Sequence, residues 1–278
     1  MCDACLTTDC ERSNDNLPMH LIAHVAESGL EVESFTTPAE LWALWRKLPV
    51  GSFVIGRHRT PAVLKRSPRG LQFFAAAPGL GGTTAPESVA HQIAKIKLAL
   101  GMRAAGFDAK VEHSGASPSG EEWQADVFVN SQSGPMAIEI QLSRQHWDDY
   151  RHRTERYKTS GVSVVWLVRG AHLKALANST LRHWQSQGFT LDDSKNRFME
   201  DMPCIPLVEA ADNEDGHRVI VYPADRSAPV LRETLENFGA GLAAGALSLG
   251  QNSFLDGSNP RPGWMWDRTK VALLKARP

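Results

Sequence analysis

Three polar side chains interrupt two otherwise apolar segments in the middle of the sequence. Asp126 lies in a Gln-Ala-Asp-Val segment where an acid is unexpected, and Glu139 and Gln141 lie in Ala-Ile-Glu-Ile-Gln. Residues two apart on a strand share one face, so Glu139 and Gln141 point the same way and the isoleucines point the other way. A short Ser-Gln-Ser-Gly turn joins the segments and predicts antiparallel neighbours, which brings Asp126 towards Glu139.

Two carboxylates in this arrangement predict a site for a divalent metal ion beside a scissile phosphate. Hard oxygen ligands suit Mg²⁺ or Mn²⁺, and a bound ion polarises a phosphoryl oxygen and lowers the pKa of a bound water. Gln141 is then placed to orient that water. A solvent-facing strand is the alternative, and for Glu139 alone it would be preferred. The three residues together favour metal-dependent hydrolysis of phosphodiester bonds.

Upstream, Glu87, His91 and Lys95 recur every fourth residue and form one polar stripe on a predicted helix. The side chains of this stripe could point into the same site. The alternative interpretation is a solvent-exposed helix face. Glu112, on the first predicted strand after that helix, is a further candidate ligand for the metal or the water.

Downstream, Arg153 and Tyr157 lie one turn apart on another predicted helix. An arginine fork and a phenol at this spacing are suited to holding a phosphate. The alternative is an exposed arginine that packs over a half-buried tyrosine. Arg151 belongs to the same basic stretch of the sequence.

These residues need a mixed β-sheet with helices packed on it, an α/β (α+β) fold. The predicted elements are a helix over 86–105, strands over 109–113, 124–130 and 136–142, a helix over 143–159 and a buried strand over 162–168. We expect three regions: a small β-rich N-terminal module over 1–80, a core over 85–190 and a C-terminal extension over 191–278. In the extension we expect two paired strands, a helix over 229–249 and a tail over 250–263.

The composition is that of an ordinary globular protein: 42% of the 278 residues are hydrophobic and 22% are charged. The formal net charge of −1 gives no overall positive field, so a nucleic-acid surface must be a local basic patch. The sequence shows no membrane span and no signal peptide, so a cytoplasmic location is the default. Cys2, Cys5 and Cys10 with His20 could form a zinc site, although a frayed terminus with incidental cysteines is favoured.

Taken together, these motifs resemble the nuclease domain of competence protein CoiA-like proteins, which belong to the PD-(D/E)XK superfamily. The resemblance covers roughly residues 85 to 170. It is carried by Glu87-x3-His91-x3-Lys95, Ala125-Asp126-Val127, Glu139-Ile140-Gln141-x-Ser143, Arg153-x3-Tyr157 and Val164-Val165-Trp166-Leu167-Val168. Residues 57–77 resemble an eroded form of the small N-terminal module of that family, without its cysteines and histidine.

The resemblance implies a restriction-endonuclease-like core in which Asp126 and Glu139 bind the metal. Gln141 then stands where the superfamily usually has a lysine. Glutamine cannot stabilise developing negative charge as an ammonium would, so Lys95 is our candidate to supply that charge. Gln124 also departs from the family, which commonly has a basic residue before the Ala-Asp-Val step.

We therefore expect a cytoplasmic Mg²⁺- or Mn²⁺-dependent nuclease, an endonuclease that binds DNA in processing, recombination or defence against foreign DNA. Its metal ligands would be Asp126 and Glu139, with the carbonyl of Ile140 and Glu112 as further ligands. The predicted catalytic set is Asp126, Glu139, Gln141, Lys95, His91 and Glu87, and the predicted nucleic-acid-binding set is Arg153, Tyr157, Arg151 and Ser143. The alternatives are an inactive nucleic-acid-binding or partner-docking protein with the same fold and, less favoured, a structural-zinc adaptor. A homodimer or partner proteins stay open.

Overall fold

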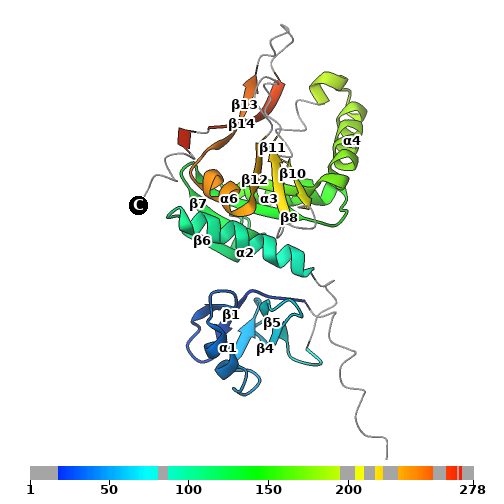
Figure 1. Cartoon of the computed structure of the whole chain (residues 1–278). Coiled ribbons are helices and arrows are strands. Elements are labelled where there is room, and N and C mark those ends of the chain that lie inside the picture. The colour runs from blue at the N-terminus through cyan, green and yellow to red at the C-terminus, as the bar shows by residue number, and fades with distance from the viewer. Residues whose placement is uncertain are drawn as a thin grey trace, which may run out of the picture. The chain divides into compact units, whose positions relative to one another are not determined.

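The computed structural model describes residues 18–80, 87–194, 204–209, 217–221, 231–252, 261–267 and 269–270. The chain divides into two compact units, residues 1–92 and residues 93–278. The division falls inside one continuous helix, α2 (Val89–Ala104), most of which belongs to the second unit (Figure 1). The N-terminal cysteines considered for zinc lie outside the described residues.

The first unit is built on a five-stranded antiparallel sheet in the order β2-β1-β3-β4-β5. Its elements are β1 (Ile22–Val25), β2 (Glu31–Glu33), α1 (Ala39–Trp45), β3 (Phe53–Ile55), β4 (Thr60–Arg66) and β5 (Gln72–Ala76). Trp42 of α1 packs its ring against Phe74 of β5, with 4.9 Å between centroids, and both side chains are buried. The first unit is therefore rich in β-structure.

The second unit contains a seven-stranded mixed sheet in the order β12-β11-β10-β9-β8-β7-β6. Strands β8, β9 and β10 run parallel, and the other neighbours are antiparallel. The strands are β6 (Ala109–Ala116), β7 (Glu122–Ser131), β8 (Gly134–Gln141), β9 (Ser163–Arg169), β10 (Cys204–Glu209), β11 (His217–Val221) and β12 (Leu231–Thr234). The predicted mixed sheet flanked by helices is thereby confirmed, and the α-β-β-β-α-β order from α2 to β9 is the expected one.

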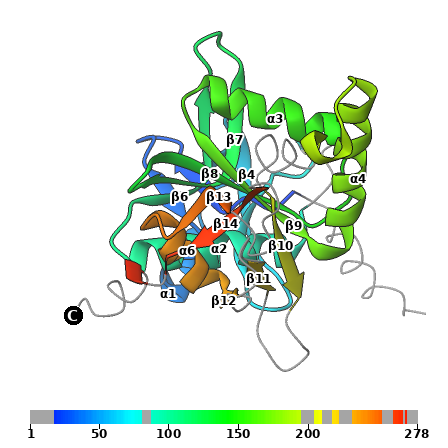
Figure 2. The same cartoon turned by 90° about the horizontal axis from the view of Figure 1, so that it is seen from above.

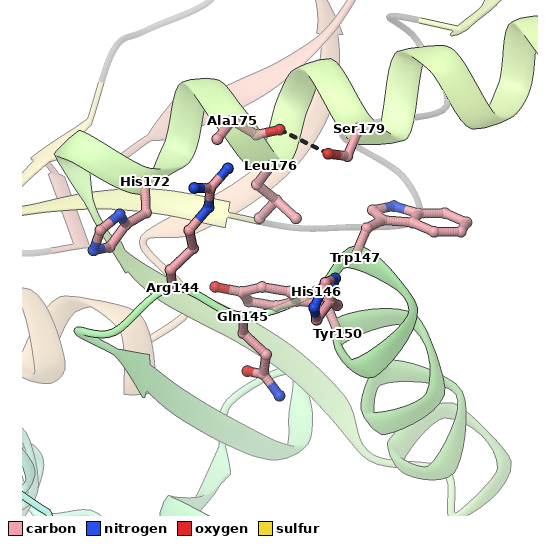
Figure 3. Close-up of a pocket in the computed structure, with 9 residues that line it drawn as sticks. All are labelled: Arg144, Gln145, His146, Trp147, Tyr150, His172, Ala175, Leu176 and Ser179. Carbon is pink, nitrogen blue, oxygen red and sulfur yellow. Dashed lines mark hydrogen bonds between the residues drawn. The ribbon is translucent and has the colours of Figure 1, made fainter.

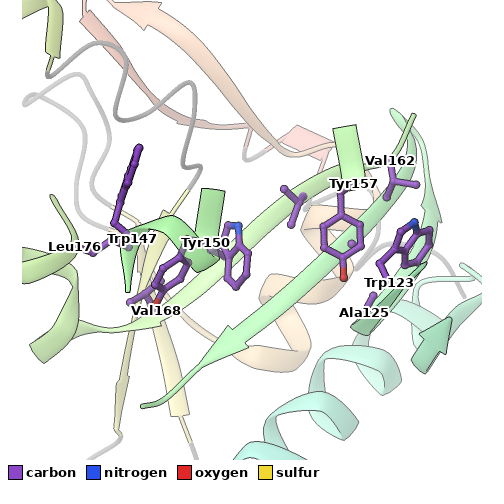
Figure 4. Close-up of a cluster of buried hydrophobic side chains, with 11 residues drawn as sticks. Trp123, Ala125, Trp147, Tyr150, Tyr157, Val162, Val168 and Leu176 are labelled. Carbon is purple, nitrogen blue, oxygen red and sulfur yellow. The ribbon is translucent and has the colours of Figure 1, made fainter. Parts of the chain in front are cut away.

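Helix α3 (Trp147–Thr159) packs on this sheet along its buried face, which carries Trp147, Tyr150, Thr154 and Tyr157 at helical spacing (Figures 2 and 4). Strand β9 is an almost continuous apolar run, as a central strand buried on both faces requires. Its Trp166 is fully buried and meets the ring of Tyr150 edge-on, at 4.7 Å between centroids. Helix α4 (Gly170–Ser186) follows directly and packs beside β9 and β10.

The C-terminal region differs from our expectation in two places. The predicted helix over 229–249 is instead β12, helix α6 (Leu235–Ala243) and strand β13 (Leu247–Asn252). The helix begins late because the Thr234 hydroxyl caps it by accepting the Asn237 N–H, and it ends before Gly245, whose φ is +69°. The predicted tail contributes β14 (Arg261–Trp266), which pairs antiparallel with β13.

Strands β10 to β12 belong to the same sheet as β6 to β9. From the sequence, we expect this region to be a separate extension. Within the described residues, no helix is long and apolar enough to cross a membrane.

Candidate functional site

Asp126 lies where strands β7 and β8 part. Their ladder runs from Ser131–Gly134 up to Val127–Ile138, and beyond it the Ile140 N–H donates to Asp126 Oδ2 at 2.8 Å. The side chain of Asp126 is 12% exposed. Its carboxylate therefore fills the gap between two diverging strands, which is a fixed position on rigid elements.

Lys95 reaches the same carboxylate from helix α2. Its Nζ lies 3.2 Å from Asp126 Oδ1 and 3.5 Å from Glu112 Oε1, and the lysine side chain is 2% exposed. A buried ammonium is costly unless carboxylates surround it, so the three residues stabilise one another's charges. The structure thus brings together Lys95, Glu112 and Asp126, which lie far apart in the sequence.

The backbone at Glu112 is unusual. Its φ is +52°, in the left-handed region that side-chain-bearing residues seldom adopt. The ladder between β6 and β7 pairs Val111 with Val127 and His113 with Ala125, and it skips the facing positions 112 and 126. Strain of this kind persists only where surrounding contacts over-determine it, and it clusters at functional sites.

Glu139 is held from the other side by helix α3. Its Oε2 accepts a hydrogen bond from Arg153 Nη2 at 2.5 Å, and its Oε1 contacts the Tyr157 hydroxyl. Burial raises the pKa of Glu139 to about 7, an effect that Arg153 opposes and that the nearby Asp126 carboxylate reinforces. Glu139 is therefore a buried acid whose pKa lies near neutral pH and depends on the charge of Asp126.

Arg153 and Tyr157 do not present free phosphate-binding groups. The Arg153 guanidinium stacks on Trp166, with its Cζ 4.7 Å from the ring centroid, and its side chain is 28% exposed. Tyr157 is 1% exposed, and its hydroxyl lies 3.1 Å from the Gln124 carbonyl oxygen. Burial raises the Tyr157 pKa, so the phenol stays protonated as a hydrogen-bond donor. Both side chains fix the orientation of Glu139, and sequence reasoning did not identify this role.

Of the other predicted residues, Gln141 is half-buried, whereas Ser143 and Arg151 are exposed. The Gln141 Nε2 donates to the carbonyl and hydroxyl oxygens of Ser143 at 3.0 and 2.9 Å, which folds the side chain back on its own loop. Arg151 lies over the Trp147 ring with its Cζ 5.2 Å from the centroid, and its Nη2 is 3.8 Å from Asp148 Oδ1.

One group of side chains can offer ligands to a divalent cation. Glu87, His91 and Asp126 each supply one ligand atom, and these atoms all lie within 4.8 Å of one another. The His91 Nδ1 lies 3.5 Å from Glu87 Oε2. The sequence predicts Glu87 and His91 as catalytic residues and not as metal ligands. Their every-fourth-residue spacing is the signal that places both on one helix face. The donor set is compatible with a divalent metal ion.

The comparison with family models agrees with this geometry. Residues 87–205 match the model described as "Competence protein CoiA, nuclease-like domain". No curated protein and no solved structure matched the chain. The matched segment contains all the predicted site residues, from Glu87 to Tyr157. Residues 87–205 are therefore similar to the nuclease-like domain of competence protein CoiA.

Proposed function

We propose that this chain is a nuclease of the PD-(D/E)XK type that uses Mn²⁺ or Mg²⁺ to hydrolyse phosphodiester bonds in DNA in the cytoplasm. One observation carries the proposal. In a nuclease-like domain, the Asp126 carboxylate is fixed between two strands by the Ile140 N–H, and Lys95 Nζ lies 3.2 Å from it. An acid and an ammonium held this close suit a reaction in which a phosphate gains negative charge.

The residues fit a divalent metal ion by their donor chemistry. Asp126, Glu87 and His91 would hold it, and Glu139 would join when it loses its proton. Carboxylates suit Mg²⁺ and Mn²⁺, whereas an imidazole ligand suits transition metals, so this set favours Mn²⁺ over Mg²⁺. A bound metal would supply Lewis-acid polarisation of the phosphoryl oxygen and a water of lowered pKa.

The protein side chains then have separate tasks. Lys95 stabilises charge that develops on the phosphate, as Gln141 cannot, and the Gln141 amide oxygen accepts a hydrogen bond from the attacking water. Arg153 and Tyr157 position Glu139, and Arg153 keeps positive charge beside a carboxylate whose pKa lies near 7. Glu112 balances the charge of Lys95.

A second candidate is a nucleic-acid-binding protein that has this fold without catalysis. Two features favour it. Both carboxylate oxygens of Glu139 are engaged, one by Arg153 and one by Tyr157. Gln141 also stands at the position where the resemblance to the superfamily leads us to expect a lysine. In this case Glu139 is a structural acid, and Asp126 with Lys95 is a buried ion pair.

The test is cleavage of plasmid and single-stranded DNA with Mn²⁺ or Mg²⁺ by the wild type and by Glu139→Gln. We expect cleavage by the wild type, more with Mn²⁺, and a large loss in the variant. Wild type that binds DNA without cleaving it under any of these conditions would support the second candidate.

A further inference from the structure

A cavity of about 250 Å³ lies in the second unit, where the loop after β8 meets the first turn of α3 and the side of α4 (Figure 3). Arg144, Gln145 and His146 of the loop line it, as do Trp147 of α3 and His172 of α4. Its volume is below the roughly 300–1,000 Å³ of sites for drug-sized ligands. The cavity therefore suits a small group, such as a phosphate with part of its nucleotide.

The lining is rich in hydrogen-bond donors and contains no carboxylate. Arg144, His146 and His172 supply a guanidinium and two imidazoles, and the other lining residues are neutral. Figure 3 shows the Arg144 side chain extended towards α4, between His172 and Leu176. A guanidinium fork among neutral and imidazole groups favours an anion, and phosphate oxygens match it in geometry.

Two residues that line the cavity each have a buried polar atom without a hydrogen-bond partner among the described residues. These atoms are the Trp147 Nε1, a donor on a side chain that is 8% exposed, and the Gln145 Oε1, an acceptor. Buried polar atoms are nearly always paired in folded proteins, by protein, water or ligand. Neither atom has accessible surface, so the cavity occupant is defined by the exposed donors of the lining, Arg144 above all.

The cavity is connected to the candidate site through a single side chain. The Trp166 ring contacts Tyr150 of the cavity wall on one side, and Arg153 stacks on the same indole at 4.7 Å. Arg153 in turn holds Glu139. Along the chain, Arg144 directly follows Ser143, the hydrogen-bond partner of Gln141. The loop after β8 therefore carries both the partner of Gln141 and the arginine that lines the cavity.

From these observations we infer that the cavity binds a phosphate of the nucleic-acid strand, together with part of its nucleotide. This phosphate contacts the Arg144 guanidinium, beside the imidazoles of His146 and His172 that line the same cavity. This inference rests on the proposed function, because it assigns a substrate contact within the nuclease-like domain.

The test measures binding of a fluorescein-labelled single-stranded DNA by anisotropy, over a range of salt concentrations and in EDTA so that no cleavage occurs. Arg144→Gln is compared with Arg182→Gln, a matched loss of charge on α4 at an exposed residue that does not line the cavity. We expect Arg144→Gln to raise Kd about tenfold and to lower the salt slope by about 0.7, the value for one phosphate contact to a single strand. Arg182→Gln should change neither.

Competition supplies a second readout. Thymidine 5′-monophosphate should compete with the labelled DNA and thymidine should not, and Gln145→Glu, which keeps the shape and adds a negative charge, should weaken that competition. Equal binding and equal salt slopes for both arginine variants would overturn the assignment of the cavity. If the wild type still cleaves DNA in that case, the proposed function stands. If Arg144 governs binding but no cleavage occurs, the cavity assignment stands and the proposed catalysis fails.

Discussion

Lys95 Nζ lies 3.2 Å from Asp126 Oδ1, although the two residues come from a helix and a strand with β6 between them in the sequence. The lysine also lies 3.5 Å from Glu112, so one buried ammonium serves two carboxylates. In the proposed mechanism, the cation that stabilises this buried cluster also stabilises the charge that develops on the phosphate.

Lys95→Met should therefore impair both stability and cleavage. Removal of the ammonium leaves Asp126 and Glu112 without this cation in a buried place, which should lower the free energy of unfolding by roughly 3–5 kcal/mol. Loss of charge stabilisation should slow cleavage by about 10²-fold or more. Urea unfolding and plasmid cleavage measure the two effects.

Lys97→Met is the control, since Lys97 is on the same helix and its side chain is 24% exposed. A Lys95→Met protein that folds and cleaves as the wild type does would remove Lys95 from the mechanism.

Glu139→Gln should change how stability depends on pH. The pKa of Glu139 rises from 4.5 to about 7 on folding, so between these values the folded state keeps a proton that the unfolded state has released. Wild-type stability relative to the variant is then highest below pH 4.5, falls as pH rises to about 7 and is constant above it. The fall is at most about 3 kcal/mol.

Urea titrations of both metal-free proteins from pH 4 to about 8 measure this difference. The contributions of groups that do not interact with Glu139 cancel in it. A difference that is constant over this window would show that the Glu139 pKa is not raised by folding.

Asp126→Asn should remove stabilisation by metal. A metal ion that binds only the folded protein raises the free energy of unfolding by about 2.7 kcal/mol at one hundred times Kd, and the melting temperature rises with it. We expect Mn²⁺ to raise the wild-type melting temperature and to leave that of Asp126→Asn unchanged. Glu155→Gln, at an exposed acid of α3, should respond as the wild type does. A normal Mn²⁺ response in Asp126→Asn would place the metal elsewhere.

Gly101→Ala should destabilise the second unit. A Cβ at Gly101 would lie 2.1 Å from the Glu236 carbonyl oxygen, a backbone atom that cannot give way without moving α6. We expect a loss of about 1–3 kcal/mol or more in the free energy of unfolding. Leu100→Ala, at a 44% exposed position of the same helix, should be nearly neutral. Equal stabilities would mean that α6 does not pack on α2, and that the C-terminal region is separable.

Local patterns predict the central fold well because they repeat at the periods of strands and helices. The apolar run of β9 and the alternation in β8 define buried strands, and the stripe Glu87, His91, Lys95 predicts a helix that faces the site. The C-terminal helix was predicted too long because apolar residues continue through Ala246 and Leu247, past the glycine that ends it.

The pairing of charges was less accessible from the sequence. Arg153 and Tyr157 have the residue types of a phosphate site, yet helix α3 turns both towards the buried Glu139. Nothing local distinguishes these outcomes, since they depend on how α3 lies on the sheet. The Gln145 Oε1 and Trp147 Nε1 atoms are buried without a hydrogen-bond partner among the described residues. This also cannot be predicted from the local sequence, because it depends on how the loop packs in the fold.

Asp126 is central to the proposed nuclease site, and one comparison of variants tests its role most directly. Wild type and Asp126→Ala are incubated with plasmid and with single-stranded DNA in Mn²⁺ or Mg²⁺, and DNA binding of both is measured in EDTA. We predict that the wild type cleaves and that Asp126→Ala binds DNA but does not cleave it. Equal cleavage by the two proteins, or none by either while both bind DNA, would contradict the assignment of a metal-dependent nuclease site to Asp126.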